Sequence, residues 1–216
     1  MFTPIVFDPE VNQNPRPAST RVLADSSYAL CMRSSSERDY FLTTERLKFS
    51  RWRKEDLALA MVLWGDPRVT AFICGPFSAD QVAARLDQEI ECLRTNQIQY
   101  WPVFLSGTGD FTGCAGLRPY GEDKQVLELG FHFRPEYWGQ GLVQEAARGV
   151  IAFAFQTLAV TSLFAAHHPA NAASGRLIRR LGFLFTHEEL YPPSGLVEPC
   201  YRLTNPAATQ NQPQSL

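Results

Sequence analysis

The most informative part of the sequence is a strand-to-helix junction that reads Arg134-Pro135-Glu136-Tyr137-Trp138-Gly139-Gln140-Gly141-Leu142-Val143-Gln144-Glu145-Ala146. The run before it, Gln125–Phe133, favours a strand, and Leu142–Leu158 has apolar residues at helical spacing. The first turn of such a helix carries unpaired backbone N–H groups and the positive end of the helix dipole. Because two glycines let the backbone approach a ligand closely, the turn is suited to hold a phosphate or pyrophosphate.

Two common phosphate-binding motifs do not fit this junction. A Rossmann fingerprint needs a third glycine, and Gln144 stands in its place. A P-loop needs a Gly-Lys-Ser/Thr sequence, and the chain contains no Gly-Lys pair. A glycine pair by itself is also typical of a tight turn that binds nothing, so the junction alone leaves both interpretations open.

The segments around the junction predict an α+β domain. Two helices and a hairpin precede it, predicted over Glu55–Trp64, from Ser78 onward, and over Tyr100–Leu105 and Phe111–Leu117. A strand, a helix and two further strands follow, predicted over Val160–His167, Ala172–Leu181, Phe183–Glu189 and Cys200–Leu203. This order implies a mixed, mostly antiparallel central sheet flanked by helices, with one parallel crossover through the Leu142 helix. Pro199 suggests that the last strand lies at a sheet edge.

Composition limits the class of protein. The 20 Lys and Arg residues against 22 Asp and Glu give a formal net charge of −2, which argues against a dedicated nucleic-acid binder. No apolar run approaches the ~20 residues that span a bilayer, and Met1–Glu10 lacks the basic residues of a secretory signal. The cysteines are odd in number and scattered, at Cys31, Cys74, Cys92, Cys114 and Cys200. We therefore expect a cytoplasmic protein in a reducing compartment, without nucleic-acid or membrane partners.

The chain divides into three parts. Residues 1–40 contain four prolines among polar residues and no apolar period, which predicts an extended arm. This arm is either a plain disordered tail or a lid or partner-binding segment. We expect one folded domain over residues 41–204 and a polar C-terminal tail over residues 205–216.

A second segment, Asn171-Ala172-Ala173-Ser174, begins a helix that ends at Gly182-Phe183. Asn171 is a candidate N-cap, and Ser174 falls in the first helical turn. With the junction and Leu42-Thr43-Thr44-Glu45-Arg46-Leu47, these segments resemble the GCN5-related N-acetyltransferase (GNAT) superfamily over roughly residues 41–204. The resemblance is strongest to the branch of ribosomal-protein alanine N-acetyltransferases (RimJ/RimL-like). It implies the GNAT acyltransferase fold, acetyl-CoA as co-substrate, and a primary amine as acceptor, either a protein N-terminus or a small molecule.

The resemblance also implies a set of CoA-binding residues. The strand before the glycine turn is splayed in this family, so its backbone would pair with the amide-like pantetheine arm. Amides of the turn would hold the pyrophosphate, and Asn171 would orient the end of the pantetheine. The expected set is Phe131, His132, Phe133, Gly139, Gln140, Gly141, Leu142, Val143, Gln144, Asn171 and Ser174. Arg176, Arg179 and Arg180 would either reach the 3′-phosphate or form a charged outer helix face.

Catalysis by this family would need an unprotonated amine, whereas most amines are protonated near neutral pH, so a base is useful. Glu128 is the candidate base, because it alternates with Gly130 and His132 onto one strand face and lies in an "E-L-G" that resembles the family pattern. The other interpretation is a solvated strand carboxylate. Ser174 is the candidate to stabilise the leaving thiolate, and His168 is an alternative base.

Other functions stay open at this point. The acceptor pocket is expected from the variable segments Gly65–Phe77 and Tyr191–Glu198. No metal is expected, because His167 and His168 are adjacent on extended chain and point apart. A non-catalytic acyl-CoA-binding module that acts through a partner is the main alternative function. A dinucleotide-dependent oxidoreductase rests on the glycine pair alone.

Overall fold

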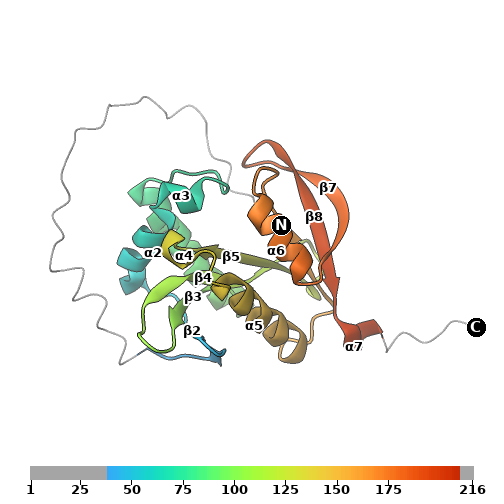
Figure 1. Ribbon diagram of the computed structural model, residues 1–216, viewed down its shortest axis with the longest axis horizontal. Helices are drawn as coiled ribbons and strands as arrows, with labels where there is room; N and C mark the ends of the chain where they lie inside the picture. The colour runs from blue at the N-terminus through green and yellow to red at the C-terminus, as the bar shows by residue number, and fades with distance from the viewer. Residues whose placement is uncertain (1–37, 210–216) are drawn as a thin grey trace, which may run out of the picture.

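The computed structural model describes residues 38–209 of the chain (Figure 1). In chain order the elements are β1 (Leu42–Thr43), β2 (Leu47–Phe49), the 3-10 helix η2 (Lys54–Asp56), α2 (Leu57–Trp64), α3 (Pro67–Thr70), α4 (Ala79–Asn96), β3 (Tyr100–Leu105), β4 (Phe111–Pro119), β5 (Val126–Phe133), the 3-10 helix η3 (Pro135–Tyr137), α5 (Leu142–Gln156), β6 (Ser162–Ala166), α6 (Ala172–Arg180), β7 (Leu184–Tyr191), β8 (Leu196–Thr204) and α7 (Pro206–Thr209).

One eight-stranded sheet organises these elements, in the order β1-β2-β3-β4-β5-β6-β8-β7. Every neighbouring pair is antiparallel except β5 and β6, which are parallel and joined through α5. The predicted fold class, a mostly antiparallel sheet with one parallel crossover, is therefore confirmed. The sequence pattern missed β1, β2 and α3, which are too short to show a period.

Helices pack on both faces of the sheet (Figure 1). Alternation along β3 shows how the two cores are divided, since Tyr100 packs with α2 and α4, whereas Trp101 packs with α5. The capping box predicted at Ser78 is present, because Ser78 Oγ accepts from the Gln81 N–H at 3.3 Å and Gln81 Oε1 accepts from the Ser78 N–H at 2.8 Å.

The parallel pair β5 and β6 separates partway along its length. Their register runs from Val126 opposite Ser162 to Glu128 opposite Phe164 and ends there. Strand β5 continues to Phe133 with β4 as its paired neighbour, from Pro119 opposite Leu127 to Gly113 opposite Phe133. The far half of β5 therefore leaves one side of its backbone open, at the strand that runs into the glycine turn.

Three expectations about the chain need correction or limits. The prediction that Pro199 marks an edge strand is wrong, because β8 lies between β6 and β7. The pairing of β8 with β6 ends at Cys200, so Pro199 has no β6 residue opposite it and its missing N–H breaks no hydrogen bond to β6. Residues 38–40 of the predicted arm pack on the domain, where Arg38 Nη1 donates to Asp56 Oδ2 at 3.0 Å, while residues 1–37 lie outside the described residues.

The predicted C-terminal tail begins as ordered structure. The backbone N–H of Asn205 donates to the Thr161 carbonyl at 2.8 Å, and the short helix α7 follows. Residues 210–216 lie outside the described part of the chain. Within residues 38–209, no helix combines the length and the apolar character needed to cross a membrane.

Candidate active site

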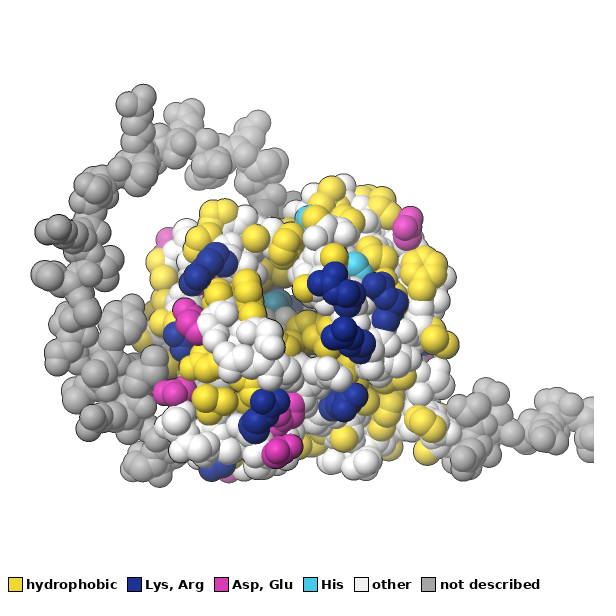
Figure 2. Space-filling model, viewed as in Figure 1, with side chains coloured by type: hydrophobic (Ala, Val, Ile, Leu, Met, Phe, Trp, Pro, Cys, Tyr) yellow, Lys and Arg dark blue, Asp and Glu magenta, His cyan; other side chains and the backbone are white. Residues whose placement is uncertain are grey.

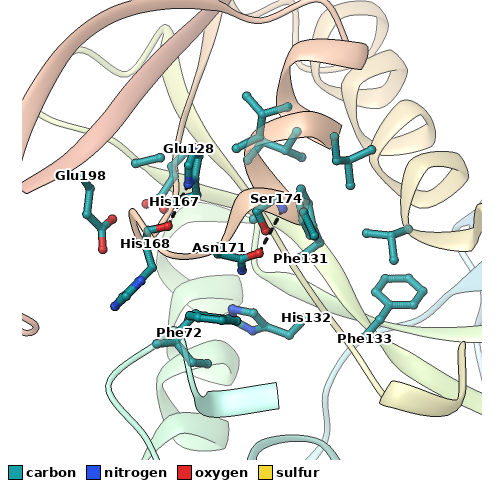
Figure 3. A pocket seen from close by; sticks show the side chains of 18 of the residues that line it. Phe72, Glu128, Phe131, His132, Phe133, His167, His168, Asn171, Ser174 and Glu198 are labelled. Carbon is teal, nitrogen blue, oxygen red and sulfur yellow. Dashed lines mark hydrogen bonds between the residues drawn. The ribbon is translucent and has the colours of Figure 1, made fainter. Parts of the chain in front are cut away.

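A cavity of about 840 Å³ opens where β5 and β6 separate. Its walls come from β5, the glycine turn, the start of α6, α3 with the loop that follows it, and the β7–β8 hairpin. Figure 2 shows the hollow in the middle of the visible face, with Lys and Arg side chains gathered beside it over α6. Figure 3 shows the same pocket from close by, with Glu128, His132, Asn171 and Ser174 directed into it.

Most of the residues predicted for the site line this one cavity. They are Glu128, Phe131, His132, Phe133, Gly139, Gly141, Val143, Gln144, Asn171 and Ser174. Two predicted residues contribute no side chain to it. The Leu142 side chain is buried in the core against the sheet, and Gln140 Nε2 donates back to the Glu136 carbonyl at 2.7 Å. Only the backbone groups of these two residues are therefore left to contact a ligand.

The glycine turn has the geometry that the sequence predicted. Gly139 and Gly141 have φ values of +73° and +76°, in the left-handed region that favours glycine. A Cβ atom on Gly139 would meet nothing within 4 Å, so the turn is open on that side. Gly141 is the N-cap of α5 and leaves the first backbone N–H groups of the helix without side-chain caps. This arrangement fits a phosphate group.

Hydrogen bonds link the glycine turn and α5 to the Leu42–Leu47 motif near the start of the domain. Glu145 in the first turn of α5 accepts from the Thr44 hydroxyl at 2.6 Å and from the Arg46 N–H at 2.7 Å. Arg46 also reaches the glycine turn, because its Nη1 donates to the Gln140 carbonyl at 3.2 Å. Burial alone would raise the pKa of Glu145, but these hydrogen bonds outweigh it and hold the pKa below its ordinary value. The carboxylate therefore stays charged and fixes the turn against β1 and β2.

Asn171 and Ser174 form the start of α6 on the opposite wall. The Asn171 Oδ1 accepts from the Ser174 N–H at 3.1 Å, so Asn171 has the N-cap role that its residue type suggested. Figure 3 shows both side chains next to Phe131. The Ser174 hydroxyl thus lies on the cavity wall, across from the strand that the resemblance assigns to pantetheine.

Glu128 lies at the point where β5 leaves β6, and its environment is specific. A Cβ on Gly130 would lie 2.2 Å from the Tyr100 ring, so the missing side chain makes room for Tyr100 on this face of β5. The Tyr100 hydroxyl then donates to Glu128 Oε1 at 3.2 Å. Burial raises the pKa of Glu128 above its ordinary value, although the nearby Arg118 charge and the Tyr100 hydrogen bond oppose this.

A buried charge network supports this arrangement. Glu89 on α4 is fully buried; it accepts from Arg85 Nε at 3.3 Å, pairs with the Arg118 guanidinium, and accepts from the Tyr100 N–H at 2.9 Å. The Arg118 guanidinium lies 4.5 Å from the centre of the Tyr100 ring. Sequence reasoning missed this network. The sequence offers one indication of it. Glu89 falls three residues after Leu86, which places a carboxylate on the buried apolar face of the helix.

His132 is held neutral and oriented. The indole N–H of Trp64 donates to His132 Nδ1 at 3.1 Å, so the proton of the neutral ring sits on Nε2. Burial and the charges of Arg85 and Arg118 push the pKa of His132 well below its ordinary value. His132 can therefore donate a hydrogen bond into the cavity, but it does not offer a free basic nitrogen there.

Among the arginines and histidines considered from the sequence, some line the cavity and others bond to neighbouring protein groups. Arg176 and Arg180 line the cavity, whereas Arg179 Nη1 donates to the Tyr201 hydroxyl at 3.1 Å. His168 also lines the cavity, and its ring centre lies 5.3 Å from that of Phe72. His167 is used structurally, with its Nδ1 at 2.9 Å from the His168 carbonyl oxygen.

One end of the cavity is lined by residues from the two segments over which the sequence predicts the acceptor pocket. Phe72 and Ile73 come from the first segment, and Tyr191, Pro192 and Glu198 from the second. Burial raises the pKa of Glu198, and the neighbouring charge of Glu128 adds to this effect. This end therefore combines aromatic and aliphatic side chains with the carboxyl groups of Glu128 and Glu198, both of raised pKa.

Comparison with known proteins agrees with this geometry. The acetyltransferase (GNAT) domain family matches residues 46–184. An uncharacterized N-acetyltransferase p20 from Bacillus licheniformis is 27% identical over 144 residues, which cover 66% of this chain and 81% of that protein. The FsC-acetyl coenzyme A-N(2)-transacetylase of Aspergillus fumigatus is 27% identical over 173 residues, which cover 73% of this chain and 72% of that protein.

Solved structures share the fold. The structure of RimL, a ribosomal L7/L12 alpha-N-protein acetyltransferase, in complex with coenzyme A has a TM-score of 0.66 and 12% identity, and the match covers 77% of this chain and 98% of that one. The family match spans more than half of the chain and includes β5, the glycine turn, α3 and α6, but not the β7–β8 hairpin. The chain therefore belongs to the GNAT acetyltransferase family and is an acetyl-CoA-dependent acyltransferase.

Proposed function

We propose that this enzyme transfers an acetyl group from acetyl-CoA directly to a primary amine, with Glu128 as the base. The observation that carries this proposal is the position of Glu128, a partly buried carboxyl with a raised pKa at the point where β5 separates from β6. A carboxylate whose pKa lies nearer to the working pH is a better general base than an ordinary surface carboxylate.

The binding residues follow from the two helix N-termini and the open strand. We propose that the first N–H groups of α5, after Gly139 and Gly141, hold the pyrophosphate. The open backbone edge of β5 near Phe131 would pair with the pantetheine amides as an added strand would. Arg176 and Arg180 on the cavity rim would attract the 3′-phosphate.

The chemical step then uses groups on three sides of the cavity. When bound, acetyl-CoA supplies the thioester carbonyl that the amine attacks. Glu128 takes a proton from the amine, directly or through water, while Tyr100 holds the carboxylate in place by its 3.2 Å hydrogen bond. Backbone N–H groups of β5 stabilise the charge that develops on the carbonyl oxygen. Ser174 stabilises the leaving thiolate by a hydrogen bond from its hydroxyl.

The amine preference can be measured with matched acceptors. The full chain is incubated with acetyl-CoA and pairs of primary amines and alcohols of equal carbon skeleton, and with peptides whose N-termini are free or blocked. We expect acetylated amines or free N-termini by mass spectrometry, together with thiol release, and no product from the alcohols or the blocked peptides. Acetylation of alcohols at rates equal to those of their amine partners would contradict the proposal, and so would acetyl-CoA binding without transfer to any amine or free N-terminus.

A further inference from the structure

Strands β7 and β8 pair as a two-stranded ribbon (Figure 1). Three side chains with metal-binding atoms meet on it. They are His187 and Glu189 on β7 and Cys200 on β8, and their ligand atoms all lie within 4.8 Å of one another. The His187 Nε2 is 3.6 Å from Glu189 Oε2. Neither the resemblance to the family nor the proposed acetyl transfer gives these three residues a role.

A β-bulge brings the three residues onto one side of the ribbon. Phe185 pairs with Tyr201 and His187 pairs with Cys200, so the pairing shifts between these two positions. The extra residue in between, Thr186, re-aims the strand as bulges do. Glu189 follows His187 by two residues and so points to the same face.

The imidazole of His187 is oriented by a neighbour that is not itself a ligand. The Thr186 hydroxyl donates its one hydrogen to the Cys200 carbonyl oxygen at 3.2 Å. The same oxygen lies 3.0 Å from His187 Nδ1, and with its hydrogen on the carbonyl it accepts from Nδ1–H. This pairing favours the tautomer whose free lone pair is on Nε2, the nitrogen that lies 3.6 Å from Glu189 Oε2. Metal-binding histidines are usually held in this way by a second hydrogen bond.

We propose that His187 Nε2, the Glu189 carboxylate and the Cys200 thiolate bind one Zn²⁺ ion. Nitrogen, oxygen and sulfur donors together favour zinc over magnesium or calcium, which prefer oxygen alone. Three protein ligands leave a fourth position for water, as at other open zinc sites. Binding replaces the thiol proton of Cys200, which goes to solvent, by a bond from sulfur to the metal.

The distances allow this site with small side-chain movements. Tetrahedral zinc places its ligand atoms about 3.5 Å apart, somewhat closer than the 4.8 Å limit of the cluster. The side chains of His187 and Glu189 are 51% and 57% exposed, so they are free to turn toward the metal. Cys200 is 2% exposed and gives the site its fixed point. Glu189 and Cys200 also line the cavity, so the proposed site borders it.

The test uses the reduced full chain with Zn²⁺ alone or Co²⁺ alone. Calorimetry with Zn²⁺ should show one ion bound per chain, and Co²⁺ should give the near-ultraviolet sulfur-to-metal charge-transfer band of a thiolate ligand. Cys200→Ser should remove the band. His187→Gln and Glu189→Gln should each weaken Zn²⁺ binding by at least ~10-fold, and Thr186→Val by about 10-fold because the imidazole is no longer oriented.

Matched controls come from the same strand and from another cysteine. Glu188→Gln and Cys92→Ser should keep both the Zn²⁺ affinity and the Co²⁺ band. The proposal is overturned if the wild-type chain binds no Zn²⁺, or if binding is unchanged in His187→Gln and Glu189→Gln. Because these two side chains are exposed, they decide the matter even where Cys200→Ser fails to fold. Neither readout depends on acetyl transfer.

Discussion

Replacing Glu128 with Gln is expected to lower kcat/KM for amine acetylation by about 10²- to 10³-fold, which is the contribution typical of a general base. The amide has nearly the same shape and can still pair with the Tyr100 hydroxyl, which lies 3.2 Å from Oε1 in the wild-type protein. It cannot accept a proton from the amine. Steady-state rates with the best acceptor from the matched panel measure the effect.

The pH dependence gives a second readout of the same residue. A base works only when deprotonated, so the rate should rise with pH through the pKa of Glu128. Burial raises that pKa, so this acidic limb should lie above the ordinary range for a glutamate. Glu128→Gln should abolish the limb while leaving acetyl-CoA affinity unchanged.

Two further variants make the assignment specific. Glu122 is an exposed carboxylate in the loop before β5, so Glu122→Gln should keep both the rate and the acidic limb. His168 lines the cavity, and His168→Gln should leave the limb in place. An unchanged pH–rate profile in Glu128→Gln would show that Glu128 is not the base, and loss of the limb in His168→Gln instead would move the role to His168.

Glu89→Gln is expected to give the largest loss of stability, about 3 kcal/mol in the free energy of unfolding. Glu89 is fully buried and is the ion-pair partner of both Arg85 and Arg118. Removing its charge leaves two like charges near each other in a poorly solvated place. Breaking a buried pair from one side is costly for this reason, even where the pair itself adds little net stability. Chemical denaturation measures the change.

The matched control lies on the same helix. Glu91 pairs with Arg94 at 2.6 Å on the exposed side of α4, so Glu91→Gln should leave the denaturation midpoint unchanged. Adding Arg118→Met to Glu89→Gln should recover part of the lost stability, since it removes one of the unpaired charges. Equal midpoints for Glu89→Gln and Glu91→Gln would contradict the role given to the buried network.

Much of the fold was predictable because its long elements have clear periods. Strand β3 was predicted over its full range, Tyr100–Leu105, and α5 to within two residues of its end. Strands β1 and β2 were missed, since two or three residues cannot show alternation. The edge position predicted from Pro199 was wrong, because a proline is tolerated in an inner strand where pairing with the neighbouring strand has already ended.

The site was only partly predictable, for a related reason. Glu128, Asn171 and Ser174 lie in local motifs, and the structure brings them to one cavity. Tyr100 comes to Glu128 from another strand, and Gly130 makes the room for it, a relation that only the register of the sheet reveals. The cluster on β7 and β8 was missed in the same way, because its ligands face each other across two strands and depend on a bulge.

Calorimetric titration of acetyl-CoA into the full chain tests the proposed binding site most directly, with Gly141→Asp and Gly141→Asn as a matched pair. Both residues tolerate the positive φ of +76° at this position, but only Asp adds a negative charge at the start of α5. We expect the wild-type chain to bind acetyl-CoA and CoA but not NADH, and Gly141→Asp to bind acetyl-CoA at least ~10-fold more weakly than Gly141→Asn. Gly121→Asp, in an open loop with φ of +64°, should bind like the wild type. Equal affinities for the Asp and Asn variants would contradict the placement of the pyrophosphate at α5. No acetyl-CoA binding by the wild type would contradict the proposed acetyl transfer itself.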